Sequence, residues 1–84
     1  MSDETTSYVD LLGAIVRPLV DHPDDVEVTE RPTEGGVALD FKVNAGDGGR
    51  VVGRGGETIR AIRLLVDFAG DMHGDLVVAD LEDA

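Results

Sequence analysis

The stretch that decides the fold is Val51–Ile62, which reads VVGRGGETIRAI. Three of the four residues from Gly53 to Gly56 are glycine, which is too many for a stable helix interior. The sequence therefore predicts a turn between two helical segments. Because glycines carry no Cβ, a sugar-phosphate chain can approach the backbone of such a turn closely, and the second helix directs its positive dipole end toward that chain. Arg54 adds a mobile cation for a phosphate oxygen.

Two other glycine motifs do not fit this stretch. A nucleotide P-loop ends in Gly-Lys-Ser/Thr, whereas Glu57 and Thr58 follow Gly56. A dinucleotide-binding turn needs a G-x-G-x-x-G pattern directly after a strand, and here helical segments flank the glycines on both sides. The remaining alternative is a tight helix–helix turn that binds no ligand.

The residues before this stretch predict a helix followed by a hairpin. Apolar residues recur every three or four positions from Tyr8 to Leu19, with Ser7 as the N-cap, a kink at Pro18 and an end at His22. Alternating apolar and polar residues then predict strands at 26–29 and 37–43, joined by a turn at 31–36.

The residues around and after the glycines predict two helices and a strand. Asp47 is expected to cap a short helix through Val52. A longer helix is expected from Glu57 until Gly70 ends it. Its apolar positions are Ile59, Ile62, Leu65, Val66 and Ala69. Residues 71–75 are expected to form a loop, and 76–81 a strand that is well covered.

These elements predict an α+β fold in the order α-β-β-α-α-β. A crossover through two helices sets the second and third strands parallel, which gives a three-stranded mixed sheet with helices packed on one face. We expect a flexible N-terminus at 1–6, a single domain at 7–82 and a C-terminal tail at 83–84.

Composition narrows the class of protein. The 84 residues carry a net charge of −11 and contain no cysteine and two histidines. This argues against disulfides, thiolate chemistry and a tetrahedral zinc site, and we expect no catalytic residues, no bound metal and no cofactor. The longest apolar run has four residues and the first six residues are polar, so we expect a cytoplasmic protein that does not bind membranes.

The charge is unevenly distributed along the chain. Residues 48–66 have a local charge of +3 from Arg50, Arg54, Arg60 and Arg63 against Glu57, whereas the other 65 residues have a charge of −14. Because salt screens charges over about 8 Å, a local basic patch can bind an anion on an acidic protein. Arginines on a solvated helix face are the alternative.

At this point the chain resembles the KH domain family. Its signature is two hydrophobic residues followed by Gly-x-x-Gly-x-x-Ile-x-x-Ile. The residues that match are Val51, Val52, Gly53, Gly56, Ile59 and Ile62. The element order resembles the type II arrangement, and residues 17–28 are similar to small bacterial single-KH proteins of the KhpA family. The resemblance implies that about four nucleotides of single-stranded RNA lie in a groove beside the loop. The RNA-binding residues we then expect are Gly53, Arg54, Gly55, Gly56, Arg50, Ile59, Arg60 and Arg63.

The resemblance also implies partners and a role. We expect a homodimer, or a heteromer with a larger KhpB-like protein, that acts as a post-transcriptional regulator or RNA chaperone. Because we expect none of the three aromatic side chains to be exposed, we expect base stacking to contribute little to affinity. The net charge and Glu57 favour an alternative, a KH-shaped protein-interaction module with little or no RNA binding. An enzyme is the third option and the least supported.

Overall fold

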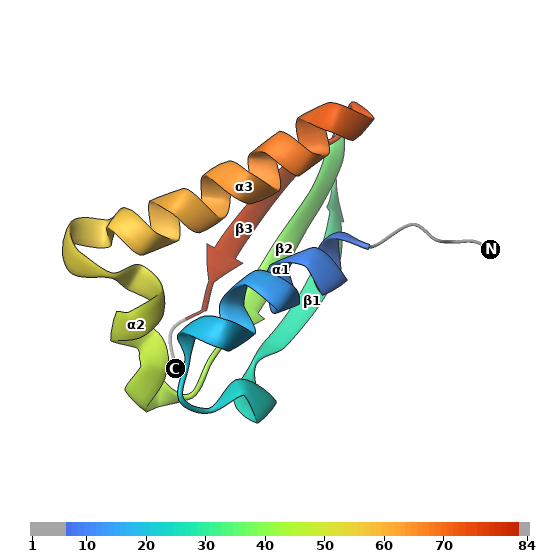
Figure 1. Cartoon of the computed structure of the whole chain (residues 1–84). Coiled ribbons are helices and arrows are strands. Elements are labelled where there is room, and N and C mark those ends of the chain that lie inside the picture. The colour runs from blue at the N-terminus through green and yellow to red at the C-terminus, as the bar shows by residue number, and fades with distance from the viewer. Residues whose placement is uncertain (1–6, 83–84) are drawn as a thin grey trace.

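The protein folds in the predicted order of helices and strands. A computed structural model describes residues 7–82. The expectations of a flexible segment at 1–6 and a tail at 83–84 lie outside the described residues. Along the chain the elements are α1 (Tyr8–Val16), β1 (Glu27–Thr33), β2 (Gly36–Lys42), α2 (Gly48–Val52), α3 (Glu57–His73) and β3 (Leu76–Leu81) (Figure 1). Short 3₁₀ turns at Arg17–Leu19, Pro23–Asp25, Ala45–Asp47 and Arg54–Gly56 connect several of them.

The sheet is mixed, as predicted. Its strand order is β1-β2-β3, with β1 antiparallel and β3 parallel to the central β2. The helices α1 and α3 lie over the same face of the sheet (Figure 1). This arrangement confirms the α+β class and the type II KH-like architecture.

The hydrophobic core lies between that sheet face and the helices. Phe41 and Leu39 on β2 are fully buried, and on β3 the buried Ala79 lies opposite Leu39 and the buried Val77 opposite Val37. The helices contribute Leu12, Val16, Val51, Ile59, Ile62 and Val66. The predicted core position Leu65 is wrong, because its side chain is 53% exposed and turned away from the face that carries Ile62 and Val66.

The first helix begins as predicted but ends earlier. Ser7 Oγ accepts a hydrogen bond from the Asp10 backbone N–H at 3.1 Å, which fits an N-cap. The α-helix ends at Val16 and a 3₁₀ turn follows, in place of a kinked helix that continues to His22. Pro18 cannot donate to the preceding turn and its ring clashes there, so regular α-helix stops before it.

The strand β1 is longer than predicted. It continues through Arg31 and Pro32 to Thr33, so the predicted turn at 31–36 shortens to the two residues between β1 and β2. Because β1 is an edge strand, Pro32 can pair with Val37 without depriving another strand of a hydrogen bond.

The helix α3 passes through Gly70, so the predicted end at Gly70 and the predicted loop at 71–75 are wrong. The helix ends at His73 and is capped by Gly74, which has φ 75°. The Asp75 N–H donates to the Gly70 carbonyl at 2.9 Å and the Gly74 N–H donates to the Asp71 carbonyl at 3.2 Å. These two bonds form a Schellman motif.

The strand β3 is confirmed in extent but not in coverage. Its side chains alternate between the core and the open face, and Leu76 and Val78 are 56% and 43% exposed. The reason is its position at the sheet edge: within residues 7–82 no fourth strand pairs with β3, and the helices cover only the other face of the sheet (Figure 1).

Candidate nucleic-acid interface

The glycine turn between α2 and α3 has the conformation that its sequence predicts. Gly53, Gly55 and Gly56 have φ values of 76°, 63° and 77°, a region that only glycine enters at little cost. The Gly53 N–H donates to the Gly49 carbonyl at 2.9 Å, and the Gly56 N–H donates to the Gly53 carbonyl at 3.1 Å. No side chain caps the start of α3 at Gly56. The backbone itself therefore forms the surface of the turn.

Gly53 and Gly55 serve different purposes in this turn. A Cβ on Gly53 would lie 2.7 Å from the Thr58 Cβ, so glycine is needed there for the turn to pack against α3. Apart from its two chain neighbours, a Cβ on Gly55 would have no atom within 4 Å. The backbone at Gly55 is therefore open to a ligand.

The basic side chains around the turn differ in their hydrogen-bond and ion-pair partners. Arg54, on the turn itself, is exposed and has no hydrogen bond or ion pair within residues 7–82. Arg60 Nη1 donates to the Gly55 carbonyl at 3.0 Å and so holds the turn against α3. Arg50 on α2 forms an exposed ion pair with Asp21 at 3.1 Å. Among these three arginines, Arg54 is the one whose side chain has no partner within residues 7–82.

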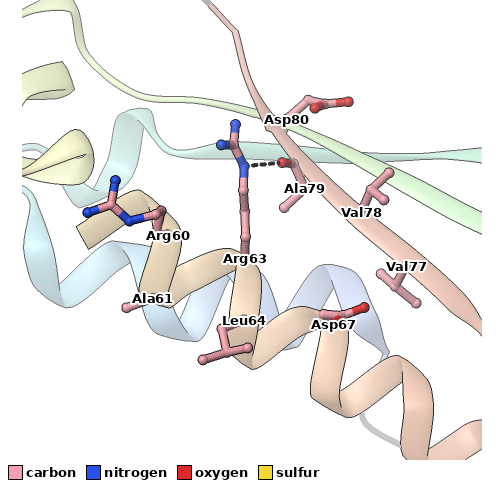
Figure 2. A pocket seen from close by; sticks show the side chains of 9 residues that line it. All are labelled: Arg60, Ala61, Arg63, Leu64, Asp67, Val77, Val78, Ala79 and Asp80. Atoms are coloured by element: carbon pink, nitrogen blue, oxygen red, sulfur yellow. Dashed lines mark hydrogen bonds between the residues drawn. The ribbon is translucent and has the colours of Figure 1, made fainter. Parts of the chain in front are cut away.

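A groove of about 740 Å³ runs between α3 and the edge strand β3. Its α3 wall is Arg60, Ala61, Arg63, Leu64 and Asp67, and its β3 wall is Val77, Val78, Ala79 and Asp80. Figure 2 shows Arg63 extending from α3 across to β3, where its Nε donates to the Ala79 carbonyl at 3.1 Å. The groove joins the turn through Arg60, which contacts both.

The structure brings most of the predicted site residues together. The four turn residues and Arg60 form one surface, and Arg60 and Arg63 line the groove beside it. Ile59 is 8% exposed and packs in the core, so it supports the groove from beneath and does not line it.

Sequence reasoning missed the β3 wall of the groove and an exposed apolar face of α3. The exposed α3 stripe, as we call it, consists of Leu64, Leu65, Phe68 and Met72, which are 68%, 53%, 63% and 69% exposed. The expectation that no aromatic side chain is exposed is therefore wrong for Phe68. The signal was present, because these residues repeat three or four apart, offset from the core positions.

A buried carboxylate joins the chain before β1 to the start of α2. Asp47 is 1% exposed and accepts hydrogen bonds from the His22 backbone N–H and from His22 Nδ1, both at 3.0 Å. Its side chain does not cap α2, which corrects that prediction. The bond to Asp47 raises the pKa of His22 above 6.5. Burial alone would raise the pKa of Asp47, but the hydrogen bonds from His22 and the Asp21 backbone outweigh it and lower that pKa below 3.8.

Residues 7–82 contain no cluster of three or more side chains suited to hold a metal ion. In the same part of the chain, no helix has the length and apolar character to cross a membrane.

Comparison with known proteins places this geometry in a family. The sequence profile described as "KhpA/KhpB, KH domain" matches residues 9–81. The chain therefore belongs to the KhpA/KhpB family of KH domains.

Several curated relatives carry the name RNA-binding protein KhpA. The protein from Bacillus subtilis (strain 168) is 48% identical over 61 residues, which cover 73% of this chain and 75% of the relative. The one from Streptomyces coelicolor is 41% identical over 71 residues, covering 82% and 90%. The one from Clostridium acetobutylicum is 37% identical over 71 residues, covering 84% and 95%. No solved structure matches the chain significantly.

Proposed function

We propose that this protein binds single-stranded RNA, with the Gly53–Gly56 turn holding the sugar-phosphate backbone. The observation that carries the proposal is the open backbone at Gly55 beside the uncommitted charge of Arg54. A phosphate placed there meets backbone N–H groups, the positive end of the α3 dipole and a guanidinium. The names of the curated relatives support RNA as the ligand.

The arrangement of charge favours a weak and local interaction. Arg50 is paired with Asp21, and Glu57 lies at the start of α3 and repels phosphate. Few cations remain for the RNA, and the rest of the surface is acidic. We therefore propose a non-enzymatic, cytoplasmic RNA chaperone or post-transcriptional regulator that needs a second module to bind RNA tightly.

The test replaces Gly55 with Asp and uses Gly35→Asp as the matched control. Both glycines have positive φ, 63° and 85°, and an added Cβ has nothing within 4 Å at either position. The backbone cost is therefore similar, about 1 kcal/mol or less for a residue type that tolerates this region. Only Gly55 lies on the proposed RNA surface.

Binding is measured by fluorescence anisotropy with a fluorescein-labelled single-stranded RNA octamer pool, and folding by thermal unfolding. We expect Gly55→Asp to weaken binding at least about tenfold, because it adds bulk and negative charge where a phosphate lies. Gly35→Asp should bind like the wild type, with a similar melting temperature to Gly55→Asp. Equal affinity of the two variants would refute the role of the turn.

We further propose that two copies pair through the exposed α3 stripe. Four large apolar side chains, each more than half exposed, gain free energy when they leave water. The ends of α3 also carry opposite charge, with Arg60 and Arg63 toward the turn and Asp67 and Asp71 toward the other end. An antiparallel pair of α3 helices would therefore be complementary in charge, with Phe68 near the two-fold axis.

Phe68→Glu tests this pairing, and Leu76→Glu, the same kind of change at an exposed apolar residue of β3 outside the stripe, is the control. Sedimentation velocity should give a dimer for the wild type and Leu76→Glu, and a monomer for Phe68→Glu. A wild-type chain that stays monomeric at high micromolar concentration would contradict self-association. The stripe would then favour the alternative function, a protein-interaction module whose partner is a KhpB-like KH protein.

A further inference from the structure

The groove between α3 and β3 contains one side chain held in a position to recognise a base. Arg63 leaves α3, crosses the groove and donates its Nε hydrogen to the Ala79 carbonyl at 3.1 Å (Figure 2). This bond fixes the long side chain in an extended form, so the entropy cost of ordering it is met before a ligand arrives. Arg63 is therefore preorganised.

The anchored Arg63 leaves its two terminal nitrogens available. Within residues 7–82, Nη1 and Nη2 of Arg63 have no hydrogen bond and no ion pair. They form a planar pair of donors in a fixed geometry, which suits two acceptors that lie side by side. Arg60 differs, because one of its terminal nitrogens is already bound to the Gly55 carbonyl.

A carboxylate lies on the same wall of the groove as this pair of donors. Asp67 follows Arg63 by four residues on α3, so the two side chains share one face of the helix. Val77, Val78 and Leu64 supply apolar surface around them. The groove thus offers apolar surface, the two free donors of Arg63 and, about one helical turn further along α3, the Asp67 carboxylate.

The four RNA bases differ in how they match this pattern. Guanine presents adjacent acceptors at N7 and O6, followed by donors at N1 and N2. Cytosine presents adjacent acceptors at O2 and N3, followed by a donor at N4. In uracil the N3–H donor separates the acceptors O2 and O4, and in adenine the N6 amino group lies between N1 and N7 while C2–H lies between N1 and N3. Neither base therefore presents two adjacent acceptors to a fork of two donors.

We propose that Arg63 makes the groove select guanine or cytosine over adenine or uracil at one position of the bound strand. The proposal rests on the proposed RNA binding and deepens it, because it assigns base preference to a residue that the phosphate-binding turn does not use. Arg63 acts on the base edge, while the turn holds the backbone.

The test measures discrimination and not affinity alone. Four fluorescein-labelled hexanucleotides are compared by anisotropy at one salt concentration: all uridine, or uridine with one central guanosine, cytidine or adenosine. We expect the guanosine and cytidine strands to bind about tenfold more tightly than the other two. Arg63→Lys keeps the charge but has no fork, so it should bind the all-uridine strand like the wild type and lose the tenfold preference.

Arg17→Lys is the control, because it makes the same chemical change on an exposed residue outside the groove. It should keep the preference. Equal binding of all four strands by the wild type, or a preference that survives in Arg63→Lys, would overturn this inference and leave RNA binding itself intact. Absence of binding to every strand by the wild type would overturn the proposed function and this inference with it.

Discussion

Replacing either of two buried helix glycines, Gly13 and Gly70, by alanine should change the free energy of unfolding, but in opposite directions. Replacing glycine by alanine in a helix interior stabilises it by about 1 kcal/mol when the methyl group fits. At Gly70 it does not fit, because a Cβ would lie 2.7 Å from both the Asp75 carbonyl oxygen and the Val77 Cγ2. At Gly13 the atoms in the way belong to the guanidinium end of Arg17, which is exposed and can rotate.

The magnitudes follow from these contacts. Overpacking against a fixed backbone carbonyl costs about 1–3 kcal/mol, so Gly70→Ala should lower the free energy of unfolding by about 1 kcal/mol after the helix gain is subtracted. Gly13→Ala should raise it by up to about 1 kcal/mol. For a domain of this size, each kcal/mol corresponds to about 4–8 °C in melting temperature.

Thermal unfolding followed by circular dichroism measures both variants under one condition. Gly70→Ala should melt below the wild type, and Gly13→Ala at or above it. If Gly70→Ala were stabilised as much as Gly13→Ala, the close packing of α3 on β3 would not explain why α3 contains a glycine three residues before its end.

Two further outcomes follow from the charges. The His22–Asp47 pair should make the free energy of unfolding depend on pH. Because the pKa of His22 is raised, its stabilising effect is complete below about pH 6.5 and is lost as the pH rises through the folded-state pKa. Because the pKa of Asp47 is lowered, its stabilising effect is present above about pH 4 and is lost on acidification. The melting temperature should therefore fall on the alkaline side, and His22→Gln should flatten that fall; an identical slope in both proteins would contradict the assignment. For RNA binding, two or three phosphate contacts predict a slope of log K against log salt of about −1.4 to −2.1, and a slope steeper than about −4 in a salt titration would mean that many more cations are involved.

The sequence predicted the order of the elements and the turn because both depend on local signals. Glycine density defines the turn at 53–56, and strict alternation defines β2 around Phe41. What it could not predict depends on neighbours far along the chain. Gly70 looks like a helix end in sequence, but its lack of a side chain is explained by Val77, which packs against it from β3.

In the candidate site, too, the features set by local sequence were predictable and those set by contacts between distant segments were not. The turn residues were predicted as a group, and the three glycines among them adopt positive φ. The partners of the arginines were not predictable, because Arg63 meets a carbonyl 16 residues away and Arg50 meets Asp21 in another segment. Asp47 was assigned to a helix cap by its position, whereas tertiary contact with His22 uses its carboxylate.

The parallel pairing of β2 with β3 affects the order in which the chain folds. β3 supplies Val77 and Ala79 to the core and pairs with a strand that ends more than 30 residues earlier. During synthesis, the hairpin can form while the inner edge of β2 still lacks a neighbour, and such an edge can pair with the wrong chain. The core is complete and α3 is fixed in place only after β3 pairs with β2. The groove beside the Gly53–Gly56 turn therefore forms in the same slow, long-range step that completes folding.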